Sequence, residues 1–405
     1  MQADFSIPNL PHGDFQKKAH FTVQFAVESN MISTKPLKTL GQLLFLCLLS
    51  PAVCISQATL DVPAISPKQQ FISVAPGVKL EVLDWGGSGR DLVLLAGGGN
   101  TAHVFATLAP KLARHFHVFG ITRRGAGASS TPPSGYTARQ YGDDIVAVLD
   151  ALRLTNPVLI GHSIAGEEMS AVSKYHEGRV AALVYLDAGG PFALYNPEHG
   201  DIDTDRIELQ EDLAKLGQNK FDHTLIVKTL TDETRYRRNL QDLRDEIEGA
   251  EAPSPSELDR SSIAAFQNYF VGYYGGIMPE DEIRQKYQIA ATGAVGERIS
   301  HASPNRVAEL EMERFNSVET RALVVIPSPE GLNRGVTRDP VKLAAYKAQE
   351  VSRKQGQLEI WRKQKRAQIV VIPNAMHYVF LSNEAEVISL ITGFVDQLPF
   401  SKTLE

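Results

Sequence analysis

The sequence predicts an α/β protein in which helices cover both faces of a mostly parallel sheet. Between residues 91 and 190, short runs of apolar residues alternate with helical patterns, and the same alternation resumes after residue 319. Continuous apolar runs are typical of strands buried on both faces, and parallel strands need crossover helices between them. With 43% hydrophobic residues in 405, the chain can also form the large core that such a sheet requires.

The predicted elements follow one another in a regular order. A hairpin is expected first, because residues 71–74 and 78–85 alternate apolar and polar side chains around a Pro-Gly pair. Buried strands are then expected at residues 91–95, 117–121, 157–160, 180–186, 321–327 and 367–372. Helices are expected at residues 102–114, 137–153, 164–177, 340–365 and 383–398.

A helical insertion is expected between the two halves of the sheet. Residues 191–318 show helical patterns and no convincing strand, which divides the predicted core into residues 59–190 and 319–405. The helical patterns lie at residues 206–216, 234–248, 257–274, 279–291 and 305–315. We interpret an insertion of this size, placed between two late strands, as a cap.

The N-terminal segment differs in composition from the rest of the chain. Residues 31–58 combine a basic start, the apolar run LGQLLFLCLLSPAV and small residues at the end, which together indicate a secretory signal peptide. Residues 1–30 are polar and unpatterned, and we interpret them as an unstructured extension or the product of an upstream start site. A secreted or periplasmic protein is expected, with an uncleaved membrane anchor as the alternative.

Cysteine content and net charge narrow the possible functions. Both cysteines, Cys47 and Cys54, lie within the predicted signal peptide, so the processed chain would contain no disulfide and no reactive thiol. The net charge is -6, and the body of the chain has no dense cluster of basic residues. This charge argues against a nucleic-acid partner. The partner we expect is a small-molecule substrate.

Two strand ends carry the residues of greatest chemical interest. At residues 161–166 the sequence GHSIAG follows a buried strand and opens a helix. A strand that turns into a helix within one residue holds Ser163 at an exposed apex, and only small neighbours let the backbone turn so tightly. At residues 96–100 three glycines follow another strand, where backbone N–H groups can point into a cavity as acyl transfer requires.

Five ordered motifs resemble those of the α/β-hydrolase superfamily, over roughly residues 70–400. They are LLAGGG at 94–99, RRGAGAS at 123–129, GHSIAG at 161–166, VYLDA at 184–188 and PNAMHYVFLS at 373–382. The chain looks like the capped branch, which includes esterases, lactonases, haloperoxidase-like proteins and dehalogenases. A serine at position 163, where dehalogenases and epoxide hydrolases carry an aspartate, argues against those two groups.

The resemblance implies a catalytic triad in the chain order serine, acid, histidine. Ser163 would be the nucleophile, and His377, in a loop after a late strand, would be the base. The acid would orient the imidazole and stabilise its cation. Glu330 occupies the region where most of the family places this acid, but Asp187 ends the preceding strand, as in some capped members. We expect Asp187 to be the acid and keep Glu330 as the alternative.

The remaining implications concern the oxyanion hole and cofactors. The backbone N–H groups of Gly98 and Ile164 would donate to the oxyanion, and Ala96 stands where the family often has histidine. No cofactor and no metal is expected, because His115 and His117 lack a third ligand.

Other polar and aromatic residues are interpreted as structural. His162 is expected to pack beside the nucleophile, and Glu167 and Glu168 lie in the first turn of the following helix, where negative charge is favourable. Aromatic residues recur at helical spacing within 266–274 and are expected to form the cap's core, while the glycines around residue 275 suggest a movable lid.

The function expected from these residues is that of a serine hydrolase. It would cleave a small to medium carboxylic ester, lactone or thioester through an acyl-enzyme, without a cofactor. A low-turnover ligand-binding or sensing protein, or a lyase on the same fold, is the alternative.

Overall fold

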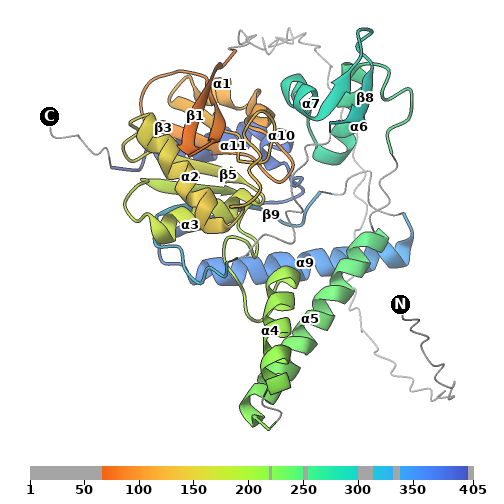
Figure 1. Cartoon of the computed structure of the whole chain (residues 1–405). Helices are drawn as coiled ribbons and strands as arrows, with labels where there is room; N and C mark the ends of the chain where they lie inside the picture. Colours follow the sequence, from red (N-terminus) through yellow and green to blue (C-terminus); the bar gives the residue numbers. More distant parts are fainter. Residues whose placement is uncertain (1–65, 219–220, 250–253, 300–312, 332–337, 400–405) are drawn as a thin grey trace, which may run out of the picture. The chain divides into compact units, whose positions relative to one another are not determined.

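The computed structural model describes residues 66–218, 221–249, 254–299, 313–331 and 338–399. Its centre is an eight-stranded sheet with the strand order β1-β2-β4-β3-β5-β6-β9-β10 (Figure 1). The strands are β1 (Lys68–Ala75), β2 (Val78–Asp84), β3 (Asp91–Leu95), β4 (His117–Ile121), β5 (Val158–His162), β6 (Ala182–Leu186), β9 (Ala322–Pro327) and β10 (Ala367–Ile372).

The sheet is parallel except at one edge. β1 pairs antiparallel with β2 and β2 antiparallel with β4, whereas every pair from β4 to β10 is parallel. All side chains of β5, β6 and β9 are buried, in keeping with their continuous apolar sequence. The predicted fold class, a mostly parallel sheet with a largely helical insertion between late strands, is therefore confirmed.

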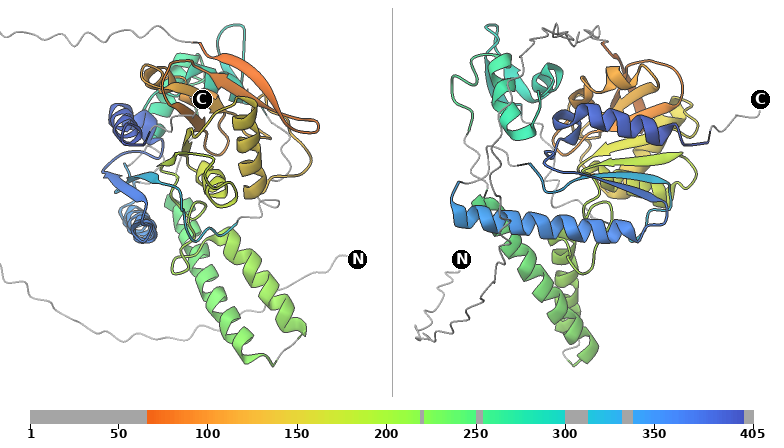
Figure 2. Two further views of the ribbon diagram at one scale, coloured as in Figure 1. Left: turned by 90° about the vertical axis from the view of Figure 1, so that its left-hand side faces the viewer. Right: turned by 180° about the vertical axis from the view of Figure 1, so that it is seen from behind.

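Helices cover the sheet on both faces. α2 (Ala138–Ala151), α3 (Ala165–Tyr175) and α9 (Pro340–Arg362) lie against one face, and α11 (Glu384–Val395) lies against the other. Figure 2 shows α9 and α11 on opposite sides of β10. The indole of Trp361, fully buried on α9, lies 4.8 Å from the ring of Tyr185 on β6 and donates to the Gly189 carbonyl at 2.7 Å.

One predicted helix is shorter than expected. Residues 102–114 form a 3₁₀ turn, η1 (Ala102–Phe105), and a single helical turn, α1 (Ala109–Leu112), instead of one helix. Pro110 explains the break, because proline has no N–H to donate and its ring clashes with the preceding turn of a continuous helix. The prediction of a continuous helix over residues 102–114 was wrong.

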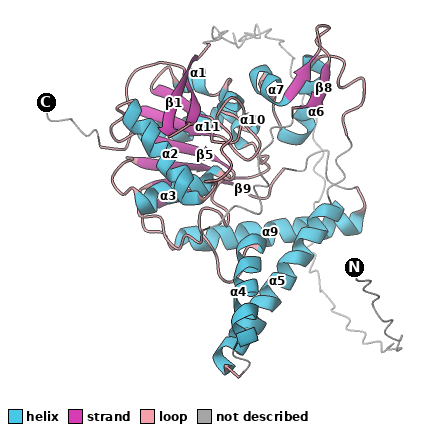
Figure 3. Cartoon of the chain, viewed as in Figure 1, coloured by secondary structure: helices cyan, strands magenta, loops and turns pink. Residues whose placement is uncertain are grey.

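The insertion between β6 and β9 contains helices and also a hairpin (Figure 3). Its elements are α4 (Ile202–Gln218), α5 (His223–Gly249), α6 (Ile263–Tyr274), α7 (Glu280–Lys286), β7 (Tyr287–Ile289) and β8 (Val295–Arg298). The prediction that the insertion contains no strand was wrong, and so was the prediction of a helix that continues to residue 291. The chain leaves the helix at Lys286, and Gly293, with φ +83°, turns it back into β8.

The two ends of the insertion differ from the prediction in other ways. α4 and α5 are longer than the patterns at 206–216 and 234–248, and they lie side by side. α6 begins only after Ser262, whose hydroxyl accepts from the Ala265 N–H, so residues 257–262 are not part of the helix. Most of the pattern at 305–315 lies outside the described residues.

Residues 1–65 are also outside the described part of the chain, so the extension and the signal peptide remain predictions, as do the domain boundaries. Within the described ranges, no helix combines the length and the apolar composition needed to cross a bilayer.

Candidate active site

The strand end at β5 forms a tight turn with Ser163 at its apex. Ser163 has φ +55°, a left-handed conformation that is uncommon outside glycine, and α3 begins at Ala165. The glycines beside it have no space for a side chain. A Cβ on Gly161 would lie 2.7 Å from the Met169 side chain, and one on Gly166 would collide with the Ala188 carbonyl oxygen. The small residues of the motif are therefore required by packing.

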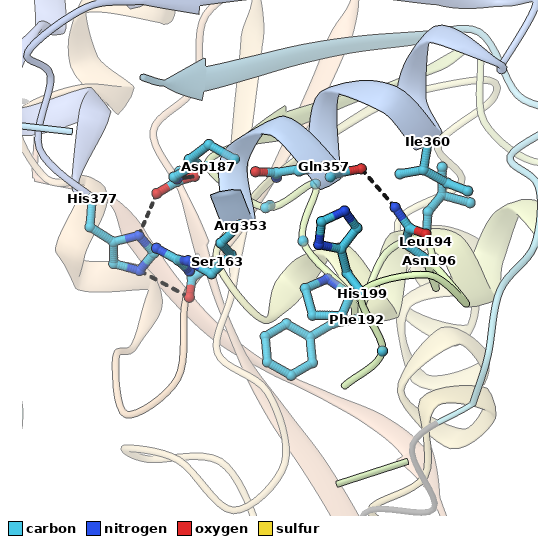
Figure 4. Close-up of a pocket in the computed structure, with 17 residues that line it drawn as sticks. Ser163, Asp187, Phe192, Leu194, Asn196, His199, Arg353, Gln357, Ile360 and His377 are labelled. Carbon is cyan, nitrogen blue, oxygen red and sulfur yellow. Dashed lines mark hydrogen bonds and ion pairs between the residues drawn. The ribbon is translucent and has the colours of Figure 1, made fainter. Parts of the chain in front are cut away.

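Three of the predicted site residues meet at this turn (Figure 4). His377 follows β10 and places its Nε2 3.1 Å from Ser163 Oγ and its Nδ1 2.7 Å from Asp187 Oδ2. Asp187 directly follows β6, the strand next to β5, with φ +44°. The serine hydroxyl can thus donate to Nε2 while Nδ1 donates to the carboxylate, which is the arrangement needed to activate a hydroxyl nucleophile.

The other candidate acid, Glu330, does not take the acid position at the imidazole. Both ring nitrogens of His377 are already engaged, by Asp187 and Ser163. Glu330 Oε2 lies 3.9 Å from Lys354 Nζ, and the same ammonium is 2.6 Å from Asp187 Oδ1. The two carboxylates therefore lie on either side of one lysine, and only Asp187 also reaches the histidine.

Asp187 is buried and held in its ionised form. Burial acts to raise its pKa, but the Lys354 ammonium and the hydrogen bond from His377 together outweigh burial, so the pKa of Asp187 lies below its usual range. An ionised acid with both oxygens engaged has a fixed orientation, as a residue that orients an imidazole needs.

The predicted oxyanion donors, Gly98 and Ile164, lie close together at the turn. A Cβ on Gly98 would lie 3.7 Å from the Ile164 side chain, and one on Gly97 would lie 2.6 Å from His162 Nδ1 and 3.1 Å from Ser163 Cβ. The glycine loop therefore runs directly against the serine. Within the described residues no hydrogen bond is made by the N–H of Gly98 or Ile164, so both remain available to a ligand.

A cavity of about 280 Å³ opens beside the serine and the histidine. One wall is the loop after β6 and the other is the face of α9. Its lining combines apolar side chains, polar side chains and glycines, and the side chains at its far end are Phe192, Leu194, Asn196, His199, Gln357 and Ile360. Asn196 donates to the Gly356 carbonyl at 3.0 Å, which ties the loop to the helix.

Known proteins are similar to this chain in sequence over the part that contains Ser163. The family profile of the alpha/beta hydrolase fold matches residues 92–276. The AB hydrolase superfamily protein YisY of Bacillus subtilis is 33% identical over 165 residues, which cover 38% of this chain and 61% of that protein. The 2-(acetamidomethylene)succinate hydrolase of Mesorhizobium japonicum is 29% identical over 137 residues, covering 34% and 45%. The chain spans about half the length of the curated relatives it matches.

Solved structures agree on the fold. The crystal structure of E-2-(acetamidomethylene)succinate hydrolase has a TM-score of 0.51 at 22% identity and covers 82% of this chain and 99% of that one. An esterase from Exiguobacterium antarcticum has a TM-score of 0.50 at 17% identity and covers 82% and 100%. The chain belongs to the α/β-hydrolase superfamily.

His162 has a more specific place in this α/β-hydrolase than packing alone. Its ring is buried, lies 4.6 Å from the His377 ring, and its Nε2 donates to the His377 carbonyl oxygen at 3.0 Å. Burial, with a smaller contribution from the charge of His377, lowers the pKa of His162 to about 3, so it is neutral at working pH. His162, the residue before Ser163, thus supports the loop that carries His377.

No pattern in the sequence indicated the polar network beside the glycine loop. Asn100 is buried and accepts a hydrogen bond from the Tyr378 hydroxyl at 2.8 Å, while its amide donates to Glu282 at 2.8 Å. Glu282, on α7 of the insertion, also accepts from the Thr101 hydroxyl at 2.5 Å. The network joins the insertion, the glycine loop and the residue after His377. The one hint in the sequence is that Asn100 directly follows the motif LLAGGG and Tyr378 lies within the motif PNAMHYVFLS.

Arg123 was also overlooked, although it begins one of the quoted motifs. Its guanidinium donates to the Ala96 carbonyl and pairs with Glu168 of α3 at 2.9 Å, and both charged side chains are buried. Arg123 therefore links the glycine loop to α3, the helix that follows Ser163. Glu168 is thus paired with Arg123. Burial raises the pKa of the neighbouring Glu167 to about 8, and the negative charge of Glu168 adds to this shift.

Outside this site, His117 and Lys228 form ion pairs with carboxylates. His117 lies 2.9 Å from Asp84, in keeping with a structural role and not a metal pair with His115. Among the described residues, the carboxylates with metal-like spacing are Glu208, Asp212 and Asp232. The Lys228 ammonium binds all three, which accounts for the cluster without a metal.

The insertion's aromatic residues pack mainly against one another. Phe266 is buried, and its ring lies 4.8 Å from those of Phe270 and Tyr287, while Tyr274 contacts Tyr378 at 4.3 Å. A Cβ on Gly275 would lie 2.6 Å from the Ser382 side chain. The glycine is thus needed for close packing here, so its presence gives no separate support to a lid.

Proposed function

We propose that the protein is a serine hydrolase that cleaves a small to medium carboxylic ester, lactone or thioester through an acyl-enzyme. The observation that carries the proposal is the continuous hydrogen-bonded series from Ser163 Oγ through the His377 ring to Asp187, at 3.1 and 2.7 Å. Ser163 lies at a strained turn and lines a cavity. Backbone strain and access to a pocket are both typical of a reactive residue.

The reaction follows from these positions. Ser163 Oγ attacks the substrate carbonyl carbon while its proton passes to His377 Nε2, and the N–H groups of Gly98 and Ile164 bind the resulting oxyanion. The intermediate collapses to an acyl-serine, and His377 returns the proton to the departing alcohol or thiol. Water, activated by His377, then attacks the acyl-serine, which releases the carboxylic acid product and restores Ser163. Asp187 stays ionised throughout.

The cavity suggests where substrate selectivity arises. Its volume of about 280 Å³ is near the lower end of the usual range for ligand pockets, which favours a compact acyl group. Apolar walls from Phe192, Leu194 and Ile360 suit a short hydrocarbon chain, and the polar groups of His199 and Gln357 can bind an oxygen or nitrogen further along it.

The test is hydrolysis by the full-length protein of a series of esters from acetate to dodecanoate, with lactones and acyl thioesters of matching size. We expect turnover of the shorter members and its loss, by about 10⁴-fold or more in kcat, in Ser163→Ala. Ser73→Ala, which alters an exposed serine on β1, is the matched control and should retain activity. Folded protein that hydrolyses none of these substrates would contradict the proposal, as would a Ser163→Ala variant with full activity. Ligand-induced stabilisation without turnover would instead favour a binding protein.

A further inference from the structure

Lys354 is a buried lysine in the wall of the cavity. It lies on α9, its side chain is only 2% exposed, and it lines the cavity beside Ser163. Lysine is almost never fully buried unless it is paired. Its partner is Asp187, whose Oδ1 is 2.6 Å from the ammonium while Oδ2 of the same carboxylate accepts from His377 at 2.7 Å. The lysine therefore binds the oxygen that the histidine leaves free.

The other charges around Lys354 do not replace this partner. Glu330 lies 3.9 Å from the ammonium, beyond hydrogen-bonding distance, and is equally far from Arg353, whose side chain is 60% exposed. Glu350 precedes Lys354 by one helical turn, and burial raises the pKa of its carboxyl, but among the described residues the ion pairs of Lys354 are with Asp187 and Glu330. His162, which packs on His377, is neutral at working pH. Asp187 is thus the close anionic partner of Lys354.

This pairing has two consequences for the triad. The Asp187 carboxylate is bound at both oxygens and cannot rotate, so the direction of its hydrogen bond to His377 is fixed. Lys354 also places a positive charge near the imidazole, because the two groups bind the two oxygens of the same carboxylate. When His377 accepts the serine proton, the Asp187 carboxylate that stabilises the new imidazolium is therefore already paired with the Lys354 ammonium.

We propose that Lys354 is a positioning residue of the triad, which holds Asp187 in place and, through its charge, sets the pH at which His377 becomes protonated. This inference rests on the proposed function. It predicts an enzyme that keeps its base neutral, and stays active, further into the acidic range than it would without the lysine.

The test is the pH dependence of kcat/KM in variants of the full-length protein. Lys354→Met and Lys354→Gln remove the charge, and the acid limb should move to higher pH by about one unit, since a unit charge at this range in a partly screened site has an effect of that order. Lys354→Arg keeps the charge and should leave the limb near its original position. Lys347→Met, an exposed lysine on the same helix, should leave it unchanged. An acid limb that stays in place in folded Lys354→Met and Lys354→Gln would overturn the proposal.

A second measurement separates this inference from the proposed function. The His377 imidazole can be titrated by NMR in histidine-labelled protein, with its signal assigned by comparison with His377→Gln, and no substrate is needed. We expect its titration midpoint to rise in Lys354→Gln and not in Lys347→Met. An unchanged midpoint would overturn the role of Lys354 even in an active esterase. A raised midpoint in a protein without esterase activity would support the role and count against the proposed function.

Discussion

The acid of the proposed triad offers the sharpest prediction, because two carboxylates compete for the role. Asp187→Asn keeps the size of the side chain and replaces a carboxylate oxygen by an amide. With Asp187 the Nδ1 proton is bound at 2.7 Å and Nε2 is free to accept from Ser163. An asparagine that turns its amide group toward His377 favours the opposite tautomer, in which Nε2 carries the proton and cannot act as the base. We expect kcat to fall by about 10⁴-fold.

The same change also disturbs the buried lysine, so stability must be measured alongside activity. Lys354 would lose its 2.6 Å anionic contact and keep only Glu330 at 3.9 Å. Removing one partner of a buried pair costs about 3–5 kcal/mol. Urea denaturation of each variant shows whether the protein is folded under assay conditions, so that lost activity can be assigned to the chemistry.

Glu330→Gln is the matched control. Its carboxylate contacts no ring nitrogen of His377, so we expect kcat to change by less than about tenfold. The assay is steady-state hydrolysis of the best ester at the pH of maximal activity. A folded Asp187→Asn variant with near-normal kcat, or a Glu330→Gln variant that loses the larger share of activity, would refute the assignment of Asp187.

Three further predictions concern the groups around the triad. Burial and the Glu168 charge raise the pKa of Glu167 from 4.5 to about 8, so the folded protein should lose stability as pH rises through that window. Glu167→Gln should leave the free energy of unfolding nearly unchanged at pH 4 and raise it by on the order of 4 kcal/mol at pH 9, and equal pH dependence in both proteins would contradict this. Gly190 lines the cavity and an added Cβ meets no atom within 4 Å, so Gly190→Leu should lower kcat/KM for long acyl esters at least about tenfold while acetate is little affected. An unchanged chain-length profile would place the acyl group elsewhere. Tyr378→Phe leaves Asn100 Oδ1 without its donor and should cost about 1–3 kcal/mol in urea denaturation, whereas a neutral change would show the network to be dispensable.

Much of the architecture could be predicted because its signal is local. Strands such as β5 and β6 are continuous apolar runs, and the turn at Ser163 needs small residues that are adjacent in sequence. The meeting of Ser163 and His377 followed from their positions at strand ends. The hairpin at 287–298 was missed because its strands are three and four residues long, too short to show an alternation, and they follow a true helix.

The sequence favoured Asp187 as the acid but left Glu330 as an alternative, and it did not predict the support from Lys354, because these contacts join distant segments. Asp187 and Glu330 each follow a strand, and only the folded backbone shows which carboxylate reaches the imidazole. Lys354 lies 167 residues from Asp187 on a helix whose sequence is mostly polar, so nothing marked it as buried. Glu282 likewise reaches Asn100 across 182 residues.

The central claim is that Ser163 is a nucleophile activated by His377, and covalent labelling tests it most directly. Full-length protein is treated with a fluorophosphonate, and the modified residue is located by mass spectrometry of peptides. We predict one adduct, on the peptide that contains Ser163, which is absent in Ser163→Ala and forms far more slowly in His377→Gln. Folded protein that gains no adduct, or gains it at another serine while Ser163 stays unmodified, would contradict the account.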